Sequence, residues 1–241
     1  MTSTRRTAAI AGALYLVTHV TSVAALALYG PVLHRSDYVV GPGPDTRVLL
    51  GAFLEVVLAL AVVGTAVALF PVVRSRNEGA ALGYVALRTL EAGVIAVGVV
   101  PLLAVVTLRQ DPAGATGAEA VTLGHALVAF HNWTFLLGPG FVCGTNTVLL
   151  AYVLHRAGLV ARFIPVLGLV GGPLVFASGA AQMFGGYQQF SVRAALAAVP
   201  VFLWEICLAL HLILKGFRPS AAASPAAAPV EAGAAAGAGA G

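Results

Sequence analysis

Residues 79–107 read GAALGYVALRTLEAGVIAVGVVPLLAVVT, and the architecture of the chain can be inferred outward from this stretch. It is long and apolar enough to cross a bilayer, which takes about 20 apolar residues. Arg88 and Glu91 nevertheless lie well inside it. Each charge near a helix centre costs about 2.5–3.5 kcal/mol on insertion scales, and aliphatic residues offset this at about 0.3–0.6 kcal/mol each. The helix is therefore marginal alone, and we expect neighbouring helices to hold it.

The composition of the whole chain is that of a membrane protein. Of its 241 residues, 59% are hydrophobic and 9% are charged, against roughly 25% charged in a soluble domain. At about 20 residues per span plus loops, the length predicts an all-α, polytopic transmembrane bundle of six spans in one domain over residues 1–218. The net charge of +4 falls beside apolar segments, which indicates topology rather than nucleic-acid binding. The expected partner is the lipid bilayer.

The spans are placed by the apolar runs and by the charges that end them. An extra amphipathic or re-entrant helix is expected over residues 119–137, before a Gly138-Pro139-Gly140 break. If that helix bends into the membrane, the break becomes a kink within one longer span. Residues 219–241 are low in complexity and predict a disordered tail. The six spans are expected over residues 8–28, 48–73, 79–107, 139–156, 163–183 and 194–214.

The basic residues predict that both termini are cytoplasmic, because cytoplasmic loops carry an excess of Lys and Arg. With the N-terminus inside, eight of the 13 basic residues lie at inner ends of spans, four lie in outer loops, and Arg88 is buried. The inner residues are Arg5, Arg6, Arg74, Arg76, Arg156, Arg162, Lys215 and Arg218, and the outer ones are Arg35, Arg47, Arg109 and Arg193.

Polar side chains from four spans are expected to form one layer inside the bilayer. At a rise of 1.5 Å per residue, they lie on the order of 14–18 Å from the inner ends of their spans, near the midplane of a core of about 30 Å. Glu55 and Gln182 come out at about 27 Å, nearer the outer surface. The residues of the layer, which with Glu55 we predict to form a substrate- or ion-binding site, are His19, Arg88, Glu91, Asn146 and Glu205.

The charges of this layer do not balance. Glu91, Glu205 and Glu55 share one arginine, Arg88, so that up to two negative charges are in excess. At least one carboxyl is then expected to be protonated, or to meet a cation or water. Such a group is typical of a proton relay or an ion path.

A purely structural interpretation of the layer is also open. Arg88 and Glu91 lie three residues apart on one helical face and would pair, while Glu205 accepts hydrogen bonds from Asn146 or His19. The polar groups would then only hold the helices together, as in a non-catalytic accessory protein or partner subunit.

No cofactor is expected, because the histidine spacing argues against a metal or a haem. His125 and His131 are six residues apart, about 120° around a helix, whereas two ligands on one helix need a spacing of three or four. His211 lies roughly 10 Å from the level of His19, too far to share a haem. The chain also has no P-loop, GxSxG or HExxH motif. The enzymatic alternative is a lipid-modifying enzyme that uses His125 or His131 near the outer surface.

Three Gly-x-x-x-Gly spacings predict close packing of helices inside the bundle rather than a dimer. They are Gly79/Gly83, Gly140/Gly144 and Gly168/Gly172.

Five segments carry a family resemblance: AGALYLVTHV from residue 11, GYVALRTLEAG from 83, HNWTFLLGPG from 131, RAGLVARFIPVLG from 156 and WEICLALHLILKGFRP from 204. Through them the chain resembles the bacterial integral-membrane proteins grouped as domain-of-unknown-function family 4386, from about Arg5 to Pro219. The resemblance implies a multi-pass helical protein of the bacterial cytoplasmic (inner) membrane with no established activity, so no catalytic role carries over. One departure is Ala161, where the family leads us to expect Pro before Arg162.

A small transporter or a proton- or ion-conducting protein is the function that these observations favour. Glu91 and Glu205 would take up a proton or bind the cargo, and Arg88 would set their charge state. No pair of broken helices and no inverted repeat is visible in support. A water-filled cavity that reaches Glu205 would favour transport. A dry and fully paired cluster would favour the accessory protein, and an opening toward lipid beside His131 would favour the enzyme.

Overall fold

The computed structural model describes residues 3–35, 37–41, 43–110 and 117–218, and the predicted disordered tail lies outside them. The described part confirms an all-α membrane fold, with six helices long and apolar enough to cross a bilayer. Each of the six predicted spans lies within one of these helices. The elements are α1 (Ser3–His34), α2 (Asp45–Arg74), α3 (Glu78–Gln110), α4 (Gly117–Phe135), η1 (Leu136–Val142), α5 (Cys143–Ala157), α6 (Phe163–Met183) and α7 (Val192–Leu214).

The fourth span differs from the separate helix and break expected around Pro139. The chain continues as one helix from Gly117 to Ala157, so the alternative of one longer span is the one found. Pro139 has no N–H to donate and would interrupt a regular α-helix. The π-helix η1 absorbs the interruption in a wider turn, in which the Cys143 N–H donates to the Gly138 carbonyl five residues back.

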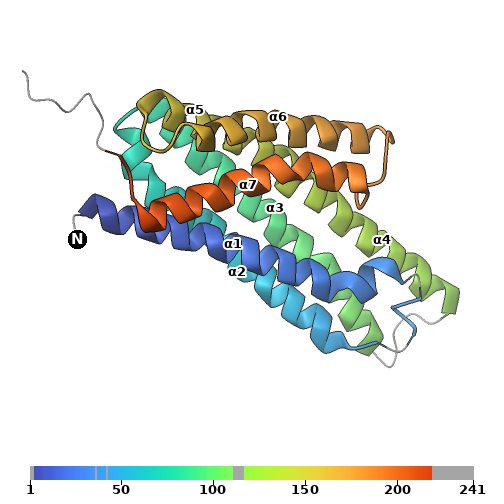
Figure 1. Cartoon of the computed structure of the whole chain (residues 1–241). Helices are drawn as coiled ribbons and strands as arrows, with labels where there is room; N and C mark the ends of the chain where they lie inside the picture. Colours follow the sequence, from blue (N-terminus) through green and yellow to red (C-terminus); the bar gives the residue numbers. More distant parts are fainter. Residues whose placement is uncertain (1–2, 36, 42, 111–116, 219–241) are drawn as a thin grey trace, which may run out of the picture.

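The start of α1 and the end of α7 lie together at one end of the bundle (Figure 1). The Arg5 guanidinium of α1 donates to three carbonyls at the end of α7, Leu212 at 3.0 Å, Ile213 at 2.7 Å and Leu214 at 2.9 Å. These carbonyls have no partner within their own helix, and a basic side chain at a helix C-terminus satisfies them. The two termini of the helical bundle therefore lie on the same side.

Glycine allows close contacts between helices, as the spacings Gly140/Gly144 and Gly168/Gly172 predicted. A Cβ on Gly144 would lie 2.8 Å from the Gly172 carbonyl oxygen, and one on Gly172 would lie 2.6 Å from the Gly144 oxygen. α5 and α6 thus touch backbone to backbone. A Cβ on Gly12 would lie 2.6 Å from the Ala209 carbonyl oxygen, so that α1 and α7 touch in the same way.

Toward the opposite end, α1 to α4 splay away from α6 and α7 (Figure 1). The loop between α6 and α7 bridges the two groups, where the Phe190 ring lies 6.3 Å from the His34 ring and 6.2 Å from the Phe135 ring. The gap between α1 and α7 is therefore closed at both ends of the bundle.

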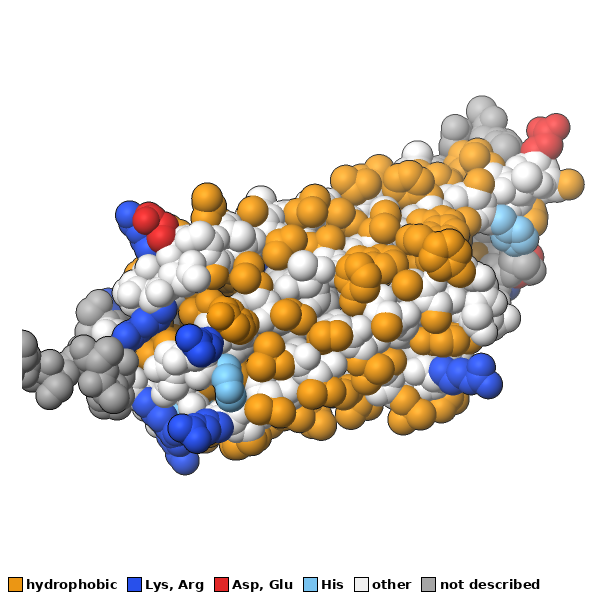
Figure 2. Space-filling model, turned by 90° about the horizontal axis from the view of Figure 1, so that it is seen from above, with side chains coloured by type: hydrophobic (Ala, Val, Ile, Leu, Met, Phe, Trp, Pro, Cys, Tyr) orange, Lys and Arg blue, Asp and Glu red, His pale blue; other side chains and the backbone are white. Residues whose placement is uncertain are grey.

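The surface of the bundle matches a lipid environment. Hydrophobic side chains cover its middle, and Lys and Arg gather toward its ends (Figure 2). Large apolar side chains in the spans are exposed, among them Val20 at 69%, Leu60 at 69% and Leu196 at 65%. An exposed apolar belt of this kind is stable against acyl chains and not against water.

Candidate functional site

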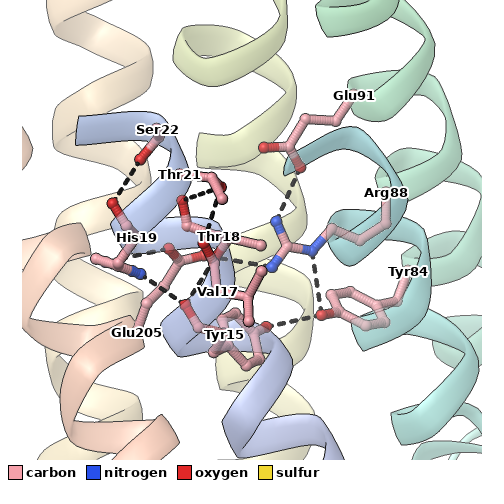
Figure 3. Close-up of polar contacts among 10 residues, drawn as sticks. All are labelled: Tyr15, Val17, Thr18, His19, Thr21, Ser22, Tyr84, Arg88, Glu91 and Glu205. Atoms are coloured by element: carbon pink, nitrogen blue, oxygen red, sulfur yellow. Dashed lines mark hydrogen bonds and ion pairs between the residues drawn. The ribbon is translucent and has the colours of Figure 1, made fainter. Parts of the chain in front are cut away.

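Arg88 occupies the centre of the bundle, and 2% of it is exposed. Its guanidinium donates in three directions (Figure 3): Nε to the Tyr84 hydroxyl at 3.3 Å, Nη1 to Glu91 Oε2 at 3.0 Å, and Nη2 to Glu205 Oε1 at 3.4 Å. Tyr84 and Glu91 lie on the same face of α3, four residues before and three after Arg88. Glu205 comes from α7, so the arginine links two spans.

Glu91 is held in this network through one of its carboxylate oxygens. Oε2 accepts from Arg88 and also from the Asn146 side-chain amide at 2.7 Å. The structural interpretation predicted the Arg88–Glu91 pair, and it expected Glu205 to accept from Asn146 or His19; His19 is the one that lies against Glu205. The Asn146 amide bonds Glu91 instead, because α5 packs on α3 at this level. A buried carboxylate with a cation and an amide donor is stabilised by its own partners.

Two tyrosines complete the side of the cluster that is nearer the start of α1, and the sequence interpretation missed both. The Tyr15 and Tyr84 hydroxyls lie 2.8 Å apart, and the Arg88 guanidinium lies 5.1 Å from the Tyr15 ring centroid. This distance is typical of a cation–π contact. Tyrosine had counted as an apolar residue in the spans. The spacing of four between Tyr84 and Arg88 was the available signal.

Glu205 is held more loosely than Glu91. Besides the 3.4 Å contact to Arg88, its Oε2 lies 3.7 Å from His19 Nε2. The His19 Nδ1 lies 3.0 Å from the Tyr15 carbonyl oxygen. A carbonyl oxygen can only accept, so Nδ1 carries the proton in this contact, and the Nε2 of a neutral imidazole is left as an acceptor.

It follows that His19 and Glu205 attract one another only when they share an additional proton. A neutral imidazole would present a lone pair to the carboxylate, and two acceptors form no hydrogen bond. A proton on Nε2 gives an ion pair, and a proton on the carboxyl gives a neutral hydrogen bond to Nε2. The 3.7 Å contact is thus an ion pair only when His19 is protonated.

Glu55 stands apart from this cluster, as its predicted depth suggested. Its Oε2 accepts from the Tyr29 hydroxyl at 3.0 Å, and the carboxyl makes no ion pair among the residues that the structure describes. The His131 ring packs edge-on against Tyr29 at 5.5 Å, and His131 Nδ1 lies 2.8 Å from the Gly98 carbonyl oxygen. Gln182, expected at a similar depth, bonds Ser178 and lies outside the cluster.

A cavity of about 220 Å³ connects the two acidic regions, with lining residues from all the helices. This is far above the roughly 10–15 Å³ that one water molecule needs. At one end the lining includes Glu205, His19 and Arg88, and at the other Glu55 and Tyr29. Leu58, Val62, Ile95 and Val201 give the wall between them a largely apolar surface, which also includes the hydroxyls of Thr18, Ser22 and Thr134.

The structure thus brings five predicted site residues into one connected cluster and places Glu55 on the same cavity. Within the described ranges, no group of three or more His, Cys, Asp or Glu side chains is placed to hold a metal ion. The five residues of the cluster are His19, Arg88, Glu91, Asn146 and Glu205.

Comparison with known proteins places the chain in a family but gives it no activity. No curated protein and no solved structure matches the sequence. One family model matches residues 10–216, which include every helix-borne residue of the cluster and the cavity. The chain therefore belongs to the family described as Domain of unknown function (DUF4386).

Proposed function

We propose that the protein is a small membrane transporter or conductor of protons or cations, with Glu205 and His19 as its central proton- or cation-binding site. The observation that carries the proposal is the cavity, because it reaches Glu205 on the side that Arg88 leaves open. A titratable side chain inside a span and facing a cavity is typical of an ion or proton pathway.

The cluster divides into two parts with different roles in this proposal. Arg88, Glu91 and Asn146 are joined by short hydrogen bonds and lock α3 to α5. Their part in function is to fix the charge beside the site. Glu205 and His19 have longer contacts, so they are the groups that respond to a cargo.

Glu55 serves as a second acidic binding position along the cavity. It lies at the other end of the cavity with one neutral partner, Tyr29. The three carboxyls around the cavity and its cluster outnumber the one arginine, which attracts a positively charged species.

The orientation follows from the basic residues and is part of the proposal. The helix ends on the side of the termini carry Arg5, Arg74, Arg156 and Lys215, with further basic residues beside them. By the positive-inside rule this side is cytoplasmic. For a bacterial protein, as the family resemblance implies, the membrane is the cytoplasmic one, and Glu55 then lies toward the outer side.

Two alternatives have less support. An accessory subunit that uses the polar groups only as glue needs no cavity beside Glu205. A lipid-modifying enzyme would use His131 or His125. His131 lines the main cavity, but it is 3% exposed and its Nδ1 is bonded to the Gly98 carbonyl. His125 borders a different cavity, between α1, α3 and α4.

The test is flux into proteoliposomes under an imposed membrane potential, with proton- and potassium-sensitive dyes. Wild type and Glu205→Gln are compared with Glu78→Gln, which removes a carboxylate that is paired with Arg74 on the surface. The expected result is flux in wild type and Glu78→Gln and none in Glu205→Gln, with all three melting alike.

Two results would contradict the proposal. One is the absence of proton and cation flux in wild type. The other is equal flux in Glu205→Gln and wild type. If flux is absent and Glu205→Gln also melts several degrees lower, the carboxylate is a structural group and the accessory-subunit alternative gains.

A further inference from the structure

We propose that the cavity takes a small amphipathic amine, which enters from the bilayer through a side window between α1 and α7. This inference names the cargo of the central site and so rests on the proposed function. It is carried by three features: the window, the apolar wall and the position of the acidic groups.

The window is framed by α1 and α7 and by two contacts between them. At one end the helices touch at Gly12 and Ala209, and at the other Phe190 lies against His34. Between these contacts the cavity reaches the surface of the bundle, because some of its lining side chains are also exposed. These are Leu26 at 39% and Phe202 at 44%, together with Ala198.

This window opens within the apolar belt, so a solute that uses it comes from the lipid. Leu26 and Phe202 belong to the membrane-spanning parts of α1 and α7. A solute that is dissolved in acyl chains must carry apolar surface. A bare inorganic cation does not partition there, since burying an isolated charge without partners costs many kcal/mol.

The wall of the cavity agrees with a cargo of this kind. Leu58, Val62, Ile95 and Val201 contribute most of the apolar surface of its middle. An apolar body gains from burial against these side chains.

The acidic end supplies the partner for a single positive charge. Glu205 contacts Arg88 only at 3.4 Å, and its other oxygen faces His19. The Phe202 ring packs edge-on against His19 at 4.7 Å, beside the carboxylate. An ammonium group placed there donates to Glu205 and lies near an aromatic ring, the two contacts that favour organic cations. The volume of about 220 Å³ limits the cargo to a small molecule.

The experiment measures binding to the full chain in lipid nanodiscs by isothermal titration calorimetry. The probe is benzylammonium, with benzyl alcohol and benzoate as neutral and anionic ligands built on the same ring. Benzylammonium is expected to bind wild type at least about tenfold more tightly than either. Glu205→Gln should lose this preference, and Glu78→Gln should keep it. Equal binding of the alcohol and the amine, or no amine binding to wild type, would overturn the inference.

The window is tested by Ala198→Phe, because the larger side chain would block the edge of the window between α1 and α7. The matched control is Ala195→Phe, an exposed alanine on the same helix that does not line the cavity. Ala198→Phe should slow benzylammonium binding at least about tenfold, and Ala195→Phe should leave the rate unchanged. Equal rates in the two variants would overturn entry between α1 and α7.

The outcomes separate this inference from the proposed function. Proton or potassium flux that depends on Glu205, without binding of benzylammonium, would overturn the inference that the cargo is an amine. The proposed conduction of protons or cations would stand. Binding of benzylammonium that depends on Glu205, without flux of any cation, overturns transport and leaves an amine-binding membrane protein.

Discussion

Arg88 of α3 and Glu205 of α7 are 117 residues apart in the chain and lie 3.4 Å apart in the bundle. The same guanidinium is 3.0 Å from Glu91, which also receives a hydrogen bond from Asn146. One arginine is thus shared unequally between two carboxylates. In the proposed function, this unequal sharing makes Glu205 the carboxylate that binds the cargo, while Glu91 keeps the arginine in place.

Arg88→Leu is expected to destabilise the protein severely. The substitution leaves Glu91 and Glu205 buried without their cation, and breaking a buried ion pair in this way costs about 3–5 kcal/mol. Thermal melting in detergent measures the effect. Arg74→Leu, which removes an exposed pair with Glu78, should cost about 1 kcal/mol or less. Similar losses in the two variants would contradict the central role of Arg88.

Tyr84→Phe should weaken the bundle moderately. It removes the hydroxyl that accepts from Arg88 and pairs with Tyr15, and leaving buried partners unsatisfied costs about 1–3 kcal/mol. At about 2–4 °C per kcal/mol the loss is visible in a melting curve. Tyr152→Phe is the control, since Tyr152 is 50% exposed. A Tyr84→Phe protein that melts with the control would show that the hydroxyl network adds no stability.

Gly12→Ala should force α1 and α7 apart. The new Cβ would lie 2.6 Å from the Ala209 carbonyl oxygen, and backbone on both sides of this contact leaves little room for adjustment. Gly93→Ala places the same group in open space and should stabilise its helix by up to about 1 kcal/mol. Melting temperatures are therefore expected to shift in opposite directions. A stabilising effect at Gly12 would contradict the close crossing.

Alkaline pH should destabilise the loop between α1 and α2. Burial raises the pKa of Tyr38 above 10.0; Arg109 opposes this shift and Asp45 adds to it. As the pH rises above about 10, the unfolded chain loses this proton while the folded chain keeps it, so stability falls with pH. The fall should be shallower in Tyr38→Phe than in wild type, whereas Tyr152→Phe should leave it unchanged. Melting curves between about pH 8 and pH 11 give the slopes, and equal slopes for Tyr38→Phe and wild type would contradict this role.

Much of the cluster could be predicted from the sequence, because depth in a membrane helix is set by residue count. The rise of 1.5 Å per residue placed Arg88, Glu91, Asn146, Glu205 and His19 on one level, and the structure joins them by contacts of 2.7–3.7 Å. Charged residues are also rare enough in spans to be noticed. The Arg88–Glu91 pair lies within one helix and could be predicted, but partners on different helices could not be assigned, since rotation about the helix axes depends on packing.

Other features lay beyond sequence reasoning for physical reasons. Tyr15 and Tyr84 are apolar enough to pass as ordinary span residues, and their hydroxyl contacts depend on how α1 meets α3. Pro139 predicted a break, but a π-helical turn costs too little to be excluded from local sequence and keeps the helix continuous. The way α1 meets α7 depends on contacts far apart in the sequence, at Gly12 with Ala209 and at His34 with Phe190.

The central claim is that the cavity beside Glu205 admits cations, and the thiol of Cys143 reports on it directly. Cys143 lines the cavity, and Cys207 does not. In a Cys207→Ser background, positively charged 2-aminoethyl methanethiosulfonate and negatively charged 2-sulfonatoethyl methanethiosulfonate are compared by mass spectrometry of the intact protein. We expect faster modification of Cys143 by the cation, and loss of this preference in Glu205→Gln. Equal modification rates for the two reagents, or a charge preference unchanged in Glu205→Gln, would contradict the account.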